Sequence, residues 1–178
     1  DEETASIGVE ASLTGHLVFS TLHTNSAPET VTRLLDMGLN PLNFSDAFLA
    51  VLAQRLVRRL CTCRQEHHPD QEEFDSIVED YGKAYFDNSG LAYSDALTLY
   101  KPGSCDKCSG TGYKGRMGIH ELMKGSKAIK KLIKQSTPAD KLFEQAIKEG
   151  MTTLKQDGIH KSFDGLTDIS EVKRVCII

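Results

Sequence analysis

Four cysteines are the first residues whose types and spacing could do chemistry. Cys61 and Cys63 form one close pair, and Cys105 and Cys108 form a second pair after a long gap. Two chelating pairs far apart in a cytoplasmic protein, the class that the composition indicates, favour tetrahedral zinc over disulfides. Glycines between Cys105 and Arg116 let backbone N–H groups turn toward thiolate sulfurs. We predict a structural zinc site, since four closed ligands leave no open position for a reaction.

A second group lies in residues 15–25, which read G-H-L-V-F-S-T-L-H-T-N. The apolar letters L-V-F predict a buried strand over residues 17–22. Small polar residues and an imidazole follow this run, and α/β sheets bind ligands at such strand ends. Two interpretations are open for the histidines, His16 and His23. They either contact a ligand or, like most lone histidines, are satisfied residues of a helix end and a turn.

The remaining patterns predict the elements that position these two groups. An acidic helix over residues 2–14 precedes the histidines, and a helix from Ser26 to Gly38 follows them. A third helix from Ser45 passes into a strand before Cys61. Further elements are a helix in the acidic segment 66–95, a strand over 117–123, and helices that start at Ser126, at Thr137 and near Thr167.

Composition bounds the class of protein. With 178 residues, of which 39% are hydrophobic, the chain can bury the core of one domain or of two small ones. The net charge of −4 argues against a nucleic-acid binder, which needs a basic face. No apolar run is long enough to span a bilayer, and no signal peptide is recognised. We expect a soluble cytoplasmic protein that is able to dock peripherally at a membrane.

The histidine-containing run resembles a motif of a known family. Residues 14–25 are similar to T-G-H-L-V-x-S-T-L-H-T-N, the histidine box of the secretion ATPases, which are the P-loop motors of type II secretion and type IV pilus assembly. Residues 1–5 resemble the second half of the R-D-x-E-T-A segment that follows Walker B in that family. The run Q-R-L-V-R-R-L-C at 54–61 also matches, and the resemblance extends over residues 1–175.

The resemblance implies an α/β fold that is the carboxyl-terminal part of a RecA-like P-loop NTPase domain. Residues 1–60 would belong to the ATPase core, 61–123 to a zinc-ribbon-like tetracysteine module with a helical insertion, and 124–178 to a small helical region. The sequence contains no Walker A motif, G-x-x-x-x-G-K-[ST], which cradles phosphates with backbone N–H groups and a lysine. We therefore expect a fragment that does not hydrolyse ATP by itself.

The resemblance also implies roles for individual residues. In the family the histidine box ends beside the γ-phosphate of ATP, so His23 would sense or polarise that phosphate. His16 and two threonines would fix the orientation of the imidazole. Further candidates are one arginine of the following helix and one of the run before the first cysteine. Each is equally typical of a solvated surface. The candidates are catalytic His23 and His16 and nucleotide-binding Thr21, Thr24, Arg33 and Arg55.

The family's biology sets the expected function. Its members are hexameric rings that use ATP and magnesium and act through a platform protein of the bacterial inner membrane. The resemblance implies an ATPase for type II protein secretion or type IV pilus assembly, with itself and the platform protein as partners and without nucleic acid. In this family, assembly and secretion members carry the tetracysteine motif, and retraction members lack it. The cysteines of this chain therefore favour an assembly or secretion ATPase over a retraction ATPase.

One departure from the family pattern leaves alternatives open. The first pair, Cys61-Thr62-Cys63, is tighter than the family's C-x-x-C. Either all four cysteines bind the metal, or His67 or His68 replaces one of them. Cys176 is most simply a buried thiol outside the site. An alternative function is a zinc-ribbon adaptor that binds a protein partner and has no role with nucleotides.

Overall fold

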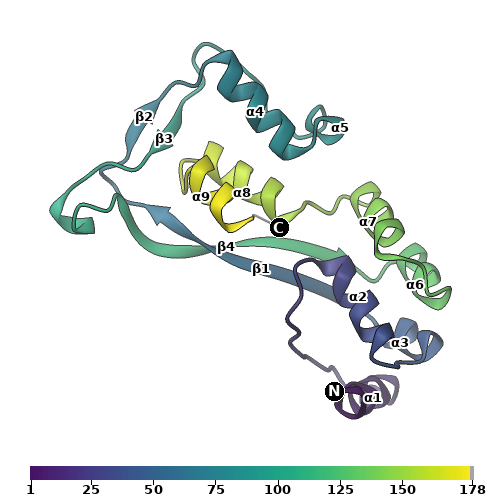
Figure 1. The fold of residues 1–178 in the computed structure, drawn as a ribbon. Coiled ribbons are helices and arrows are strands. Elements are labelled where there is room, and N and C mark those ends of the chain that lie inside the picture. The colour runs from purple at the N-terminus through teal and green to yellow at the C-terminus, as the bar shows by residue number, and fades with distance from the viewer. Residues whose placement is uncertain (177–178) are drawn as a thin grey trace. The chain divides into compact units, whose positions relative to one another are not determined.

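The computed structural model describes residues 1–176, whose helices and strands are labelled in Figure 1. The chain divides into two compact units. Unit 1 comprises Asp1–Ala53 and Glu121–Thr152, and unit 2 comprises Gln54–His120 and the chain from Thr153 onward. Two long strands, β1 (Ala50–Leu60) and β4 (Tyr113–Lys124), pair with each other and contribute residues to both units. The mixture of helices and strands confirms the expected α/β class.

Unit 1 is a group of helices around one apolar core. Its helices are α1 (Glu2–Leu13), α2 (Ala27–Asp36), α3 (Pro41–Ala47), α6 (Lys127–Lys134) and α7 (Ala139–Lys148). In α6, Ile129 and Ile133 lie one turn apart and are fully buried, whereas Lys127 and Lys131 are exposed. This spacing places one apolar face of the helix on the core. The same core contains Val31, Phe44, Met123 and Leu142.

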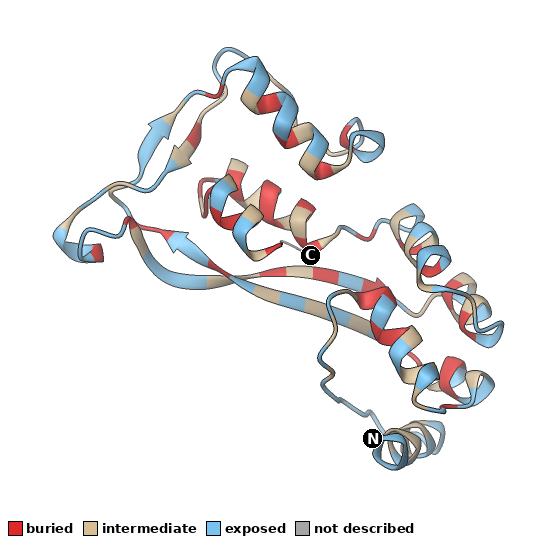
Figure 2. Cartoon of the chain, in the orientation of Figure 1, coloured by how far each residue is buried: buried red, intermediate tan, exposed pale blue. Residues whose placement is uncertain are grey.

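Unit 2 contains a short antiparallel ladder and the remaining helices. Its elements are β2 (Gln65–His67), α4 (Gln71–Tyr81), α5 (Lys83–Phe86), β3 (Leu99–Lys101), η1 (Asp106–Cys108), α8 (Leu154–Phe163) and α9 (Ile169–Val175). In the ladder, Gln65 pairs with Lys101 and His67 pairs with Leu99. Helix α4 contacts α8, and Phe74, Tyr81 and Phe86 are buried and pack edge to face. Figure 2 shows the alternation of buried and exposed residues along α4.

Several predicted helix boundaries are confirmed because their capping groups act as expected. The helix expected over residues 2–14 is α1, where Asp1 accepts a hydrogen bond from the N–H of Thr4. Ser26 caps α2, and Gly38 follows that helix with a φ of 99°. Ser126 caps α6 by accepting the N–H of Ile129 at 3.1 Å. The helix expected in the acidic segment is α4.

The buried strand predicted over residues 17–22 is wrong. Leu17 is 67% exposed and Phe19 is 87% exposed, and the segment is in neither a helix nor a strand. A strand needs a neighbour that supplies hydrogen bonds. Among the described strands, β1 pairs with β4 and β2 pairs with β3, so none of them pairs with this segment.

Two other predicted boundaries are also wrong. Helix α3 begins at Pro41 rather than Ser45, because the side chain of Asn40 accepts the N–H of Leu42 at 3.0 Å and caps it. It ends at Ala47, and the alternating residues from Ala50 onward form β1. The N-cap position of α7 is occupied by Pro138, which makes no side-chain capping bond, and not by Thr137.

Thr137 instead closes the end of the preceding helix. Its N–H donates to the carbonyl of Leu132 at 3.1 Å, and Ser136 before it has a φ of 50°.

The division into residues 1–60, 61–123 and 124–178 stays a prediction, and residues 177 and 178 lie outside the described residues. Within residues 1–176, none of the helices has the length and apolar character that crossing a membrane requires.

Candidate functional site

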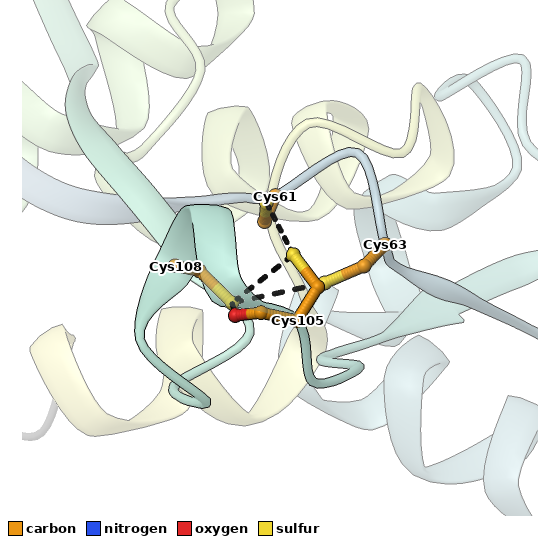
Figure 3. A group of neighbouring side chains, drawn as sticks. All are labelled: Cys61, Cys63, Cys105 and Cys108. Atoms are coloured by element: carbon orange, nitrogen blue, oxygen red, sulfur yellow. Dashed lines mark hydrogen bonds between the residues drawn. The ribbon is translucent and has the colours of Figure 1, made fainter.

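The four cysteines converge at one place in unit 2. The sulfur atoms of Cys61, Cys63, Cys105 and Cys108 all lie within 4.8 Å of one another (Figure 3). The sulfurs of Cys61 and Cys105 are 3.8 Å apart, those of Cys63 and Cys108 are 3.8 Å apart, and those of Cys105 and Cys108 are 3.7 Å apart. A tetrahedron with zinc–sulfur bonds of about 2.3 Å has edges of about 3.8 Å. The spacing therefore fits a four-coordinate zinc ion.

Two tight turns bring the sulfurs together. Cys61 follows the end of β1, and the N–H of Arg64 donates to the Cys61 carbonyl at 3.0 Å, which closes the first turn. Cys105 directly precedes the single turn η1, and Cys108 is its last residue. The N–H of Gly112 donates to the sulfur of Cys108 at 3.2 Å, as the glycine-rich block predicts.

Two glycines are required by close approach of the backbone. A Cβ atom on Gly103 would lie 1.9 Å from the carbonyl oxygen of Cys63. Gly112 has a φ of 77°, and its Cβ would lie 2.4 Å from Cβ of Pro102. Because no side chain fits at either position, these glycines allow the second turn to pack against the first.

The thiols differ in acidity. Burial raises the pKa of Cys108, but hydrogen bonds with the backbone of Cys105 and Gly112 outweigh it and lower the pKa to about 6. Burial and the neighbouring sulfurs raise the pKa of Cys63 to about 12. Several thiolates at this spacing repel one another, so full ionisation of the cluster needs a bound cation.

The two histidines considered as substitute ligands have other partners. Nε2 of His67 lies 2.5 Å from a carboxylate oxygen of Glu73. Nδ1 of His68 lies 3.0 Å from the carbonyl oxygen of Leu97. In the described part of the chain, the group with metal-ligand spacing consists of the four cysteines without either histidine.

The histidine segment, which we define as residues 15–25, belongs to unit 1. His16 is exposed after the end of α1, and its Nδ1 lies 3.1 Å from the carbonyl oxygen of Ala11. His23 and Thr21 are exposed. The hydroxyls of Thr24 and Thr30 are 2.6 Å apart, which ties the end of the segment to α2. The structure thus presents His23 to solvent and keeps His16 on its own helix end.

The candidate arginines lie in different surroundings. Arg33 is exposed on the last turn of α2. Arg55 is half-buried on β1 and donates from its guanidinium to the carbonyl of Val175 within unit 2. Thr21, Thr24 and Arg33 belong to unit 1 and Arg55 belongs to unit 2, and their role in binding a nucleotide stays a prediction.

Sequence reasoning assigned no role to one buried residue that contacts the start of α2. Glu121 is only 4% exposed, and its Oε1 accepts the N–H of Ala27, the first residue of α2, at 2.7 Å. Ile119, Glu121 and Met123 are all buried at alternate positions of β4. A carboxylate at an inward position of an alternating strand is the signal that could have found it.

A cavity of about 380 Å³ in unit 2 holds no candidate catalytic residue. It is lined by both strands of the β2–β3 ladder and by the start of α9. Two pairs of its lining side chains contact each other: Nε2 of His67 lies 2.5 Å from a carboxylate oxygen of Glu73, and the hydroxyl of Tyr113 donates to Asp168 at 2.7 Å. We assign no ligand to it.

Comparison with known proteins gives one matching family and many relatives. The family described as "Type II/IV secretion system protein" matches residues 1–174. The type IV pilus assembly ATPase PilB of Thermus thermophilus is 43% identical over 175 residues, which cover 97% of this chain and 18% of that protein. The type II secretion system ATPase E of Vibrio cholerae is 43% identical over 176 residues, which cover 98% of this chain and 32% of that protein. The chain spans about a third or less of the length of these relatives.

A solved structure resembles the fold. The pilus retraction motor PilT with bound ADP matches with a TM-score of 0.59 and 22% sequence identity, over 98% of this chain and 36% of that one. At this identity the likeness concerns the fold alone. It shows that the helices and strands of this chain resemble those of that structure in fold.

Proposed function

Because the chain belongs to the type II/IV secretion system protein family, we propose that it is the carboxyl-terminal part of an ATPase that powers type II protein secretion or type IV pilus assembly. The observation that carries the proposal is the match over nearly the whole chain to relatives named as ATPases of both systems. In this proposal the intact protein binds ATP and magnesium and forms a homo-hexamer. It works on a platform protein at the cytoplasmic side of the bacterial inner membrane.

In the proposed ATPase, His23 contacts the γ-phosphate. Its exposure supports this role, since a ligand held mainly by another part of the protein can reach it. A neutral imidazole donates one hydrogen bond to a phosphate oxygen, and an imidazolium adds a positive charge where negative charge develops. Thr21 and Thr24 orient the segment, and His16, Arg33 and Arg55 are further candidates for contact with the nucleotide. The proposal assigns the phosphate-binding loop to a RecA-like core outside these 178 residues.

The proposed role of the cysteines is to hold one structural zinc ion. The sulfur spacing and the N–H donated to Cys108 support a closed, zinc-ribbon-like tetracysteine site. The partners of His67 and His68 argue against their substitution for a cysteine. An adaptor without a role for nucleotides is not favoured, because it leaves the match to the named ATPases unexplained.

The test is the kinetics of His23→Ala in the complete ATPase. We expect turnover to fall by about tenfold or more, because a donor that acts mainly in the transition state is lost, while KM for ATP changes by less than about threefold. The exposed His68, which bonds to a carbonyl in unit 2, gives the matched control His68→Ala with unchanged kinetics. The 178-residue chain alone should show no turnover above background.

Two results would contradict the proposal. An equal loss of turnover and nucleotide affinity in His23→Ala would indicate uniform binding or misfolding in place of action on the γ-phosphate. Robust hydrolysis by the isolated chain would show that the phosphate-binding machinery lies within these residues after all.

A further inference from the structure

We propose that Glu121 is a positioning residue that holds the first turn of α2 and, through it, sets the position from which His23 is presented. The kinetic part of this inference rests on the proposed function, whereas its structural part does not. All the contacts that carry it lie within unit 1.

The first step is a buried contact between distant parts of the chain. Oε1 of Glu121 accepts the N–H of Ala27 at 2.7 Å, across 94 residues of sequence. Glu121 is 4% exposed and Ala27 is 0% exposed. The first N–H groups of a helix have no partner within it, and the helix dipole favours a negative charge there. The carboxylate therefore satisfies a donor that water cannot reach.

The second step is an account of the other donors in this first turn. Pro28 has no N–H to satisfy, and the N–H of Glu29 donates to the hydroxyl of Ser26 at 3.4 Å. That bond is near the upper limit for a hydrogen bond, whereas the bond to Glu121 is short. The cap from Ser26, which the sequence predicts, is thus the weaker of the two, and Glu121 is the main acceptor at the start of α2.

The third step connects this turn to the histidine segment. The hydroxyl of Thr30 lies 2.6 Å from the hydroxyl of Thr24, and the carboxylate of Glu29 accepts the N–H of Asn25 at 3.1 Å. Residues 24 and 25 directly follow His23 in the chain. The backbone next to the imidazole is therefore fixed from α2, and the start of α2 is fixed from Glu121.

The residue type at this position supports a specific task. Met123, the next inward residue of β4, is fully buried and belongs to the apolar core of unit 1. A carboxylate beside such a residue loses hydration, and this is favourable only when it makes strong hydrogen bonds. An aliphatic side chain at 121 would fill the same space but would leave the N–H of Ala27 without this acceptor.

The structural test uses two variants of similar size on the 178-residue chain. Glu121→Gln keeps a side-chain oxygen that can accept the N–H of Ala27, and Glu121→Met keeps the volume but has no such oxygen. We expect amide hydrogen exchange at Ala27 and Asn25 to accelerate by about tenfold or more in the methionine variant and by less than about threefold in the glutamine variant. Glu144→Gln, an exposed carboxylate on α7, is the control and should change neither amide.

The kinetic test is a double-mutant cycle in the complete ATPase. Glu121→Met should lower kcat with little change in KM for ATP, and Glu121→Gln should restore most of the activity. In a His23→Ala background, Glu121→Met should have less than about a twofold further effect, because its action passes through His23. Fully additive losses would overturn the positioning role, since they would mean that the two residues act independently.

The two readouts separate this inference from the proposed function. Unchanged amide exchange in Glu121→Met would overturn the inference whatever the enzyme does. Accelerated exchange together with normal turnover in His23→Ala would retain the structural role of Glu121 and reject the catalytic role of His23. If Glu121→Met does not fold, Thr30→Val breaks the link to Thr24 without altering β4. Faster exchange at Asn25 is then expected, and no change would again overturn the inference.

Discussion

Glu171 is a fully buried carboxylate that unit 2 stabilises with two arginines. Its oxygens accept hydrogen bonds from the guanidinium of Arg58 at 2.7 Å and from that of Arg174 at 2.6 Å. The backbone N–H of Arg58 also donates to this carboxylate, at 2.9 Å, and the Arg58 guanidinium stacks 3.9 Å above the ring of Tyr113. Burial alone raises the pKa of Glu171, but the bonds from Arg174 and Arg58 outweigh it and lower the pKa to about 2. The ionised form therefore links β1 to α9.

This network predicts a pH-dependent contribution to stability. Because the folded pKa of Glu171 lies below its unfolded value of 4.5, the contribution is present above pH 4.5 and is lost as the pH falls toward 2. We expect Glu171→Gln to lower the free energy of unfolding by about 1–3 kcal/mol at pH 7 in urea titrations. The difference in the free energy of unfolding between this variant and the wild-type chain should be smaller at pH 3. Glu79→Gln, on the exposed face of α4, is the control, and a gap that does not depend on pH would refute the role of the charge.

The sequence predicts some of these residues and not others. The four cysteines are found because chelating pairs have a recognisable spacing, and the structure brings all four together. The burial and the contacts of Glu121 and Glu171 are not predicted, since a glutamate in a strand or helix is usually solvated and only tertiary packing shows what it faces. His23 is found by resemblance alone, and its role stays a prediction.

At the scale of elements, local signals decide most boundaries. Helices with a capping side chain and a following glycine, such as α1 and α2, begin and end close to the predicted residues. The strand predicted over residues 17–22 fails because pairing is a property of two segments, and the pattern of one segment does not show whether a neighbour exists. The helix predicted from Ser45 fails because the start signal of α3 lies four residues earlier, at Pro41, where Asn40 caps the helix.

The packing of α8 on α9 gives a prediction for this scale. A Cβ atom on Gly158 would lie 2.7 Å from a methyl carbon of Val172, which is 1% exposed. We expect Gly158→Ala to lower the free energy of unfolding by about 1–3 kcal/mol, because the added methyl group overpacks the contact. Thermal and urea denaturation measure this change.

The matched control is a helical glycine with space around it. In α1, a Cβ on Gly8 would be 3.6 Å from its nearest side-chain neighbour, so Gly8→Ala should be neutral or stabilising by up to about 1 kcal/mol. Combining Gly158→Ala with Val172→Ala should cost less than the sum of the two single changes. Additive losses would show that the clash with Val172 is not the cause.

At the scale of the whole chain, the two units differ in what stabilises them. Unit 1 has a continuous apolar core, and its described members include no cysteine. In unit 2, the segments that join β1, the β2–β3 ladder and β4 meet at the four sulfurs. A metal ion bound there would cross-link these segments, and its binding energy would add to the stability of unit 2.

Metal removal should therefore affect the two units unequally. We expect about one zinc per chain by elemental analysis and four cysteines protected from thiol reagents. The variant Cys105→Ser should lose both the zinc and the protection of the remaining cysteines. A chelator should accelerate amide exchange around the cysteines and in the β2–β3 ladder, while the amides of α6 and α7 change by less than about twofold. Cys176→Ser is the control and should keep its zinc. Metal-free protein with every thiol reactive would refute the site.

The β2–β3 ladder has a consequence for protein engineering. Because β2 begins two residues after Cys63 and β3 ends shortly before Cys105, the ladder closes the base of the long connection between the cysteine pairs. The entropy of closing a loop grows only slowly with its length. The mostly exposed stretch between α5 and β3 is therefore a suitable place to insert a fluorescent reporter or an affinity tag. Such a fusion should carry as much zinc as the parent chain.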